Sequence, residues 1–194
     1  MGKVVELEPR AREDFTRSLG MIIALASWTM MFGALFFIYL GVRSRAVIWP
    51  PVGAPRLPLG LPAVGTAALV ASSVALEMGA RALRRGRRRV LAPAVALAAL
   101  LGAAFLALQL SVWRGLWDAG LRPGSGSYGS TFYGLTTLHA AHVAAGLLAL
   151  LVVLWRALGG AYTEHNVVRV RVCAMFWHFV GAVWLLMFLS LYLL

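Results

Sequence analysis

The chain has 194 residues, of which 61% are hydrophobic and only 13% are charged. Soluble domains carry about 25% charged residues, so this composition excludes a water-soluble globular fold and predicts an all-α integral membrane protein. The formal net charge is +11, but the arginines lie in short connections between apolar segments, which is typical of membrane topology and not of nucleic-acid binding. The single cysteine, Cys173, excludes an internal disulfide and a thiolate metal cluster.

Five apolar segments are long enough to cross a bilayer as helices, which takes about 20 residues. They cover residues 19–42, 63–83, 90–114, 131–157 and 169–193. We therefore predict a bundle of five transmembrane helices, which forms a single membrane domain over 19–194 after a polar tail at 1–18. The tail mixes acidic and basic residues ahead of a full-length span, so we expect no cleaved secretory signal. No internal repeat is evident, which argues against an inverted-repeat transporter.

Basic residues alternate between the connections. The polar tail, the connection at 81–89 and the flanks of the last connection are rich in basic residues, whereas the other two connections hold fewer. Since positively charged loops stay in the cytoplasm, the N-terminus is predicted to be cytoplasmic and the C-terminus periplasmic. The richest connection is predicted to lie at the cytoplasmic headgroups, and its arginines are Arg81, Arg84, Arg85, Arg87, Arg88 and Arg89.

The first outer connection, 49–62, is rich in proline and begins with Trp49. Proline fixes φ and cannot donate a backbone hydrogen bond, so this stretch is predicted to be extended and not helical. Trp49 is placed to anchor the chain at the membrane interface. The other outer connection, 122–127, contains Pro, Gly and Ser and is predicted to form turns.

Glu77 is the one acidic residue in the predicted spans, and Arg81 follows it four positions later. This spacing favours an ion pair on one helix face, with the Arg81 side chain reaching toward the cytoplasmic headgroups. Because ionisable groups are expensive in lipid, a proton-holding carboxylate and a contact with a partner subunit remain as alternative interpretations.

His139 and His142 lie three positions apart, on one side of the fourth predicted helix. Two histidines at this spacing could bind a metal, with His178 as a third ligand, but no carboxylate obviously joins them. We therefore favour hydrogen bonding across a helix interface over a metal site. Small residues nearby are predicted to let another helix approach closely. They are Ala141, Ala145 and Gly146.

The last predicted helix carries a stripe of large side chains, formed by Trp177, Trp184 and Phe188 with Gly181 between them. Such helical spacing is typical of a packing face, whereas a haem site would need an axial ligand, for which His178 is available. The chain also lacks a phosphate-binding glycine loop, a nucleophile elbow and paired catalytic carboxylates. The sequence thus predicts no catalytic centre and no bound metal or cofactor in this chain.

Six strings of residues, spread over all five predicted helices, resemble subunit III of the haem–copper respiratory oxidases. They are FFIYL (36–40) with WPP (49–51), TAALVASS (66–73), FLALQ (105–109), YGSTFY (128–133), TLHAAHV (137–143) and WHF (177–179). The length resembles the short, five-helix bacterial form of this family. Three positions depart from the usual family pattern: Gly65 replaces an asparagine, Val112 an acidic residue and Gly181 an aspartate.

The resemblance implies a non-catalytic subunit of a terminal oxidase in the bacterial plasma membrane. Such a subunit packs on subunit I in a complex with subunit II, binds phospholipids and supports proton uptake and stability during oxygen reduction, while haem and copper belong to partner subunits. The electron donor, cytochrome c or quinol, stays open, as do a nitric oxide reductase component, a histidine-based metalloprotein and a small transporter. Structural, partner or lipid contacts are expected from Glu77, Gln109, His139, His142, Trp177, His178 and Trp184.

Overall fold

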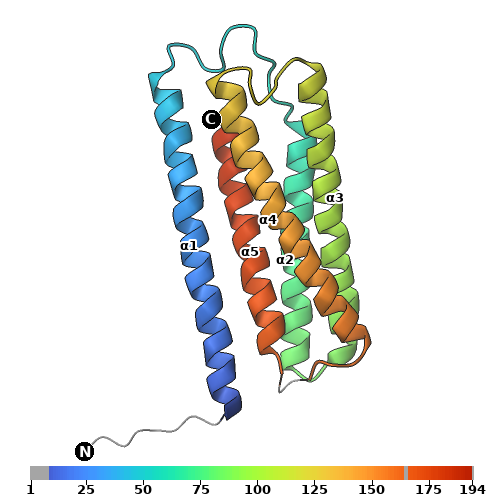
Figure 1. Cartoon of the computed structure of the whole chain (residues 1–194). Helices are drawn as coiled ribbons and strands as arrows, with labels where there is room; N and C mark the ends of the chain where they lie inside the picture. Colours follow the sequence, from blue (N-terminus) through green and yellow to red (C-terminus); the bar gives the residue numbers. More distant parts are fainter. Residues whose placement is uncertain (1–8, 164–165, 194) are drawn as a thin grey trace, which may run out of the picture.

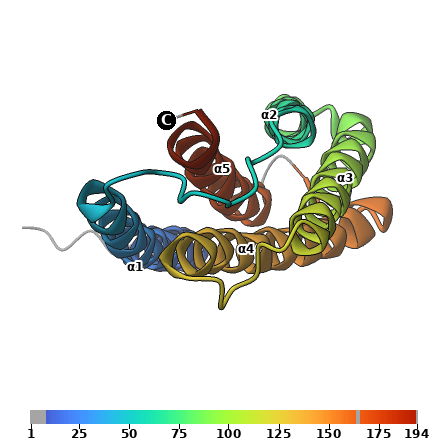
Figure 2. The same ribbon diagram turned by 90° about the horizontal axis from the view of Figure 1, so that it is seen from above.

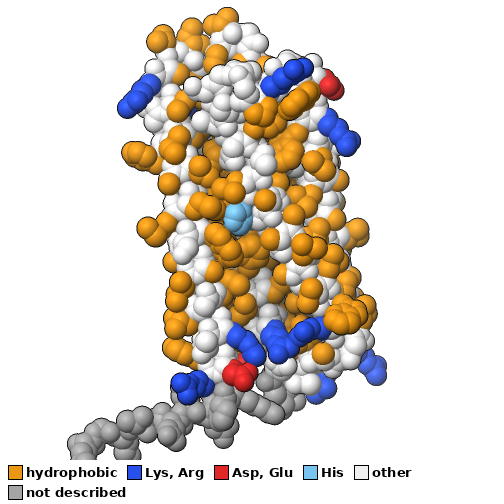
Figure 3. All heavy atoms as spheres, viewed as in Figure 1, with side chains coloured by type: hydrophobic (Ala, Val, Ile, Leu, Met, Phe, Trp, Pro, Cys, Tyr) orange, Lys and Arg blue, Asp and Glu red, His pale blue; other side chains and the backbone are white. Residues whose placement is uncertain are grey.

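The computed structural model describes residues 9–163 and 166–193. This part of the chain forms five long helices and no β-strand (Figure 1). The helices are α1 (Pro9–Arg45), α2 (Gly60–Arg84), α3 (Leu91–Asp118), α4 (Ser127–Leu158) and α5 (Val168–Phe188). All five are long and apolar enough to cross a membrane, which confirms the predicted all-α bundle. Figure 3 shows hydrophobic side chains over the middle of one face and Lys or Arg side chains near its two ends, as expected of a membrane-spanning bundle.

The helices are arranged in two unequal groups. Seen from above, α1, α4 and α3 form a curved row, and α5 and α2 lie on its concave side (Figure 2). Helix α5 packs against α1, α2 and α4, whereas α2 packs most extensively on α3. Helix α1 lies at the margin, and most of its apolar surface is left open by the rest of the chain. The packed interior is therefore built mainly from α2 to α5.

Three helices end in the same kind of turn, which keeps the connections short. After α2, Gly86 has a φ of 75° and donates its backbone N–H to Leu83 O at 3.0 Å. Helices α3 and α4 end likewise at Gly120 and Gly160, whose φ angles are 90° and 70°. Glycine suits these positions because residues with a Cβ atom rarely adopt a positive φ at the end of a helix.

The connection between α1 and α2 is not helical over 46–59, which confirms its prediction, but α2 begins at Gly60 and so takes in its last residues. Pro62 therefore lies in the first turn of α2, where its missing N–H removes no helical hydrogen bond. Trp49 packs beside the rings of Tyr39 and Tyr128, at centroid distances of 5.9 and 5.0 Å. Residues 9–18 of the predicted polar tail are part of α1, and residues 1–8 lie outside the described structure.

The end of α5 is tied to α1. After Phe188 the chain continues as a short π-helix, Leu189–Leu193. The Ser190 carbonyl oxygen accepts hydrogen bonds from the Tyr39 hydroxyl at 2.8 Å and from Arg43 Nη1 at 3.3 Å. These two side chains of α1 thus supply donors to a backbone carbonyl at the end of the bundle.

The prediction for the small residues of α4 is confirmed for Gly146, whereas for Ala141 and Ala145 it stays a prediction. Ala141 and Ala145 are exposed and do not pack against another helix of this chain, whereas Gly146 is buried. The reason is helix geometry, since Gly146 is turned by about 100° from Ala145 in a helix of 3.6 residues per turn. Gly146 meets α5, and a Cβ atom built on it would lie only 2.9 Å from Trp177 Cε3.

Candidate functional site

A cluster of ionisable side chains lies where α2 and α5 run side by side. Glu77 Oε1 accepts hydrogen bonds from Arg81 Nε at 2.7 Å and from Arg84 Nη2 at 3.2 Å. His178 Nε2, on α5, lies 3.7 Å from Glu77 Oε2. The predicted Glu77–Arg81 ion pair is therefore confirmed, and the structure adds a second arginine and a histidine from the neighbouring helix.

This cluster borders a shallow pocket on the outer surface of the bundle. The pocket has a volume of about 310 Å³, and Ser73, Val74 and Met78 complete its lining. The side chains of Glu77 and His178 remain 31% and 39% exposed. Charged groups within a membrane span are expensive when they face hydrocarbon. We name this surface the α2–α5 face, and its residues are Ser73, Val74, Glu77, Met78, Arg81 and His178.

The three histidines are not brought together. The ring of His139 is buried and stacks on Trp184 at a centroid distance of 5.3 Å. His142 Nδ1 lies 2.8 Å from Leu138 O, and its ring contacts the Trp28 ring at 5.6 Å. His178 lies apart, beside Glu77 on the α2–α5 face. Over the residues that the structure describes, no group of three His, Cys, Asp or Glu side chains could hold a metal ion.

Two tryptophans of α5 anchor this helix on α2. The Trp177 indole N–H donates to Ser72 Oγ at 2.7 Å, and the Trp184 indole N–H donates to Thr66 Oγ1 at 2.8 Å. Both indole rings are buried, so each hydrogen bond satisfies a donor that has no access to water. The predicted stripe of the last helix is thus a packing face with polar contacts, and it fixes the register of α5 against α2.

Gln109 is buried on α3, with 3% of its surface exposed. One turn further along, Trp113 Nε1 donates to Thr136 Oγ1 of α4 at 3.2 Å. The Gln109 side chain itself lies next to the hydroxyl of Tyr192 in the C-terminal turn. Polar groups of α3, α4 and the end of α5 therefore meet inside the bundle.

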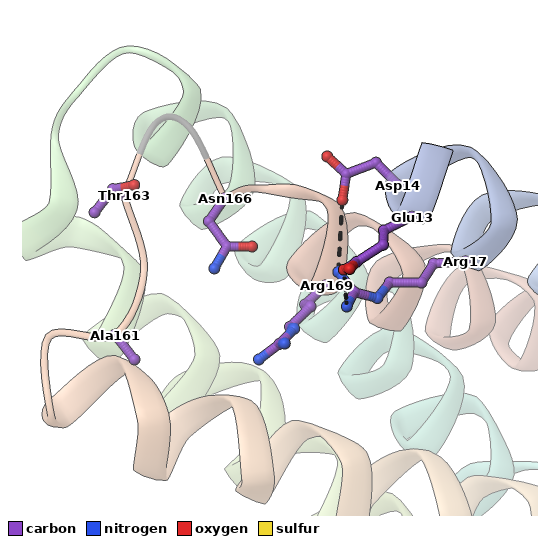
Figure 4. A pocket seen from close by; sticks show the side chains of 7 residues that line it. All are labelled: Glu13, Asp14, Arg17, Ala161, Thr163, Asn166 and Arg169. Atoms are coloured by element: carbon purple, nitrogen blue, oxygen red, sulfur yellow. Dashed lines mark hydrogen bonds and ion pairs between the residues drawn. The ribbon is translucent and has the colours of Figure 1, made fainter. Parts of the chain in front are cut away.

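A second, polar pocket lies at the end of the bundle where α1 begins (Figure 4). Its volume is about 370 Å³, and it lies between the first turns of α1 and the connection from α4 to α5. Arg17 forms ion pairs with Glu13 at 3.0 Å and Asp14 at 3.6 Å, and Arg169 lies opposite them. We name it the α1 pocket, and its lining residues are Glu13, Asp14, Arg17, Ala161, Thr163, Asn166 and Arg169.

The α1 pocket offers both signs of charge together with uncharged polar side chains. Two carboxylates and two guanidinium groups line it, with the Thr163 hydroxyl and the Asn166 amide. Burial raises the pKa of the neighbouring Tyr162 phenol, so this group stays neutral and adds no charge. The predicted arginines at 84–89 are exposed on the connection between α2 and α3, which joins the same ends of the helices as the connection from α4 to α5.

Comparison with known proteins identifies the family. The family model described as cytochrome c oxidase subunit III matches residues 14–194. Relatives named cytochrome c oxidase subunit 3 include that of Synechocystis sp., 36% identical over 179 residues (92% of this chain and 76% of the relative). The one from Thermostichus vulcanus is 34% identical over 182 residues (93% and 88%), and the one from Corynebacterium diphtheriae 35% over 178 residues (90% and 86%). The chain belongs to the cytochrome c oxidase subunit III family.

Membership of the subunit III family confirms the resemblance seen in the sequence. The chain is a multi-pass membrane subunit of a haem–copper oxidase, and it works in a complex with other oxidase subunits. The metalloprotein and transporter interpretations are not favoured, because the matched relatives cover nearly the whole chain and share one name. The α2–α5 face and the α1 pocket are therefore surfaces of a subunit III.

The sequence alone does not reveal which residues of other helices contact these side chains. It does not identify Ser72 and Thr66 as the hydrogen-bond acceptors for the two tryptophans, nor Tyr192 as the neighbour of Gln109. One signal was present, because a buried indole N–H needs an acceptor and hydroxyl groups are scarce in α2. The α1 pocket was also missed, since it joins the start of the chain to a connection far along the sequence.

Proposed function

We propose that this subunit III packs on the catalytic subunit I of its oxidase through the α2–α5 face. The observation that carries the proposal is the cluster of Glu77, Arg81 and His178 on an outward surface within the membrane spans. Charged side chains in a span ordinarily face protein or a water-filled cavity and not lipid. A protein partner on this face would remove them from hydrocarbon and supply further hydrogen bonds.

The geometry of the face suits a neighbouring helix. Ser73 and Gly181 lie close together, since a Cβ atom on Gly181 would be 3.5 Å from Ser73 Oγ. Small residues let helices approach closely in membranes, where packing rather than the hydrophobic effect drives association. The shallow pocket beside Glu77 would accept one or two side chains of subunit I.

We further propose that the α1 pocket holds a phospholipid headgroup. Arg17 and Arg169 could donate to a phosphate, while Glu13 and Asp14 could pair with the ammonium of a zwitterionic lipid. The exposed arginines at 84–89 would strengthen attraction to anionic lipids nearby, each by about 1 kcal/mol. Bound lipid would support the subunit during turnover, which is the stabilising role expected of a subunit III.

We also propose that the complex oxidises cytochrome c and not quinol, because the matched relatives are named cytochrome c oxidase subunits. Haem and copper would belong to the partner subunits, and the chain itself would hold none of the redox centres. The chain would contribute to proton uptake indirectly, by packing on one side of subunit I and by holding lipid there.

The packing proposal is tested by two bulky substitutions at equally exposed valines. Val74 lies on the α2–α5 face and is 54% exposed, and Val152 lies on α4 and is 52% exposed. We expect Val74→Trp to lower the haem recovered per tagged chain several-fold, because a bulky indole would hold subunit I away. Val152→Trp should leave the recovery unchanged. Equal haem recovery with Val74→Trp and Val152→Trp would contradict the proposal that subunit I packs on the α2–α5 face.

The lipid proposal is tested by native mass spectrometry of the purified complex. Paired substitution of Arg17 and Arg169 by Gln should lower the amount of retained phospholipid, since both guanidinium groups line the pocket. Arg56→Gln, in the outer connection, provides a control of the same chemistry away from the pocket. Unchanged lipid retention in the double variant would rule out the α1 pocket as the headgroup site.

A further inference from the structure

The interior of the bundle contains buried polar atoms that find no hydrogen-bond partner within the described structure. They are Gln109 Nε2, His139 Nδ1, His139 Nε2 and the Tyr192 hydroxyl. His139 is 1% exposed and Gln109 3% exposed, so neither side chain reaches the surface. These atoms come from three different elements, namely α3, α4 and the C-terminal turn.

The three residues share one layer of the bundle. The ring of Trp184 stacks on His139 and lies 6.3 Å from the ring of Tyr192. The Gln109 side chain lies beside the Tyr192 hydroxyl, although no hydrogen bond of good geometry joins them. Phe105, one turn before Gln109 on α3, touches the edge of His139 at a centroid distance of 6.0 Å. His139 and Tyr192 therefore both lie against Trp184, and Gln109 lies beside Tyr192.

Buried polar groups without partners are costly, most of all in a membrane, where the surrounding hydrocarbon offers no hydrogen bonds. Folded proteins commonly satisfy such groups with internal water, at about one buried molecule per 27 residues and about three hydrogen bonds for each molecule. The polar groups of this layer are an amide, an imidazole and a phenol, with no carboxylate or thiolate among them. This set suits a small neutral ligand that can both donate and accept hydrogen bonds.

We propose that the layer of Gln109, His139 and Tyr192 is an internal hydration site that binds one or two ordered water molecules. A water molecule there accepts from the Gln109 amide, donates to one ring nitrogen of His139 and reaches the Tyr192 hydroxyl. It thereby links α3, α4 and the C-terminal turn through an interior that is otherwise closed by aromatic rings. The site is independent of the α2–α5 face and of the α1 pocket.

The test is high-resolution electron cryomicroscopy of the intact oxidase complex, at a resolution that shows ordered water. We expect density within about 2.7–3.2 Å of Gln109 Nε2 and of one nitrogen of His139. Side chains that instead rotate to bond each other directly, or a layer with no density between them, would overturn the proposal. This measurement needs no substitution and so does not depend on the folding of a variant.

A matched pair of variants shows whether Gln109 holds the water. Gln109→Met keeps the length of the side chain and removes its polar atoms, so the density beside His139 should weaken or vanish. Ser111→Ala removes a hydroxyl from an exposed position of the same helix, where it bonds only to Ala107 O, and should leave the density intact. Unchanged density in Gln109→Met would show that the amide does not bind the water and would overturn its proposed role.

Discussion

At the scale of single residues, the indole ring of Trp177 shows how closely the helices approach. The ring lies between Gly102 of α3 and Gly146 of α4, and a Cβ atom on Gly102 would lie 2.5 Å from Trp177 Cη2. Only glycine leaves room for a ring in this position without movement of the helices. The packing of three helices thus depends on two residues without side chains.

We expect Gly102→Ala to destabilise the subunit by about 1–3 kcal/mol, because overpacking a filled core forces side chains and backbone apart. Gly115→Ala on the same helix is the control, since no atom lies within 4 Å of a Cβ atom there. The measurement is thermal unfolding of the purified complex, followed by the loss of subunit III. If Gly102→Ala were as stable as Gly115→Ala, the Trp177 ring would have room beside a Cβ atom at position 102, and the prediction would be contradicted.

The hydrogen bond from Trp184 to Thr66 is also expected to contribute to stability. Breaking it with Trp184→Phe or Thr66→Val should each be destabilising, and the double variant should lose less than the sum of the two. Hydrogen bonds between membrane helices typically couple by about 0.6–2 kcal/mol. A double-mutant cycle on the unfolding free energy measures this coupling, and additive effects would show that the 2.8 Å contact contributes nothing.

Contacts within one helix are predictable from the sequence, whereas contacts between helices are not. Glu77 and Arg81 are predicted to pair because they lie four positions apart on one helix, a spacing that brings their side chains together. His178 was not joined to this pair, because its distance from Glu77 depends on the register of α5 against α2. That register follows from the buried indole hydrogen bonds, which no periodicity in a single segment reveals.

At the scale of helices, α1 is the least supported element of the bundle. It lies at the margin, and its C-terminal end is held by Tyr39 and Arg43, which donate to the Ser190 carbonyl. Composition was enough to predict that the segment spans the membrane. Its attachment to the far end of the chain is not predictable from the sequence, because it depends on how the end of α5 is placed beside α1.

Tyr39→Phe should therefore loosen the C-terminal turn without unfolding the bundle. The variant keeps the buried ring and removes the hydroxyl that donates to Ser190 O, so amide hydrogen exchange over 189–193 should become faster. Thr29→Ala serves as the control on α1, since the Thr29 hydroxyl bonds only within its own helix. Equal exchange rates in the wild type and in Tyr39→Phe would argue against a role of this hydrogen bond in holding the turn.

At the scale of the whole molecule, the alternation of arginines predicts the orientation in the membrane. The connection between α2 and α3, with the last turn of α2, carries more exposed arginines than any other connection in the described part of the chain. It is predicted to be cytoplasmic, with the connection between α3 and α4 outside. The structure fixes which connections share an end of the bundle, but the side of the membrane remains a prediction from charge.

Cysteine labelling in intact cells tests this orientation. Gly124→Cys, in the connection between α3 and α4, should react with a membrane-impermeant maleimide, whereas Arg87→Cys should react only after the cells are opened. The natural Cys173 is buried, so the wild-type chain provides a low background. The reverse pattern of labelling would place the N-terminus outside.

That the chain works as a subunit III beside subunit I is tested by purifying the tagged chain with its partners in native lipid discs. The sample is then characterised by an optical spectrum, by mass spectrometry and by oxygen uptake with reduced cytochrome c. We expect haem bands, an oxidase subunit I in the same particle and oxidation of cytochrome c. A colourless chain that carries no oxidase subunit, in several mild conditions of extraction, would contradict the assignment of a subunit III that packs on subunit I.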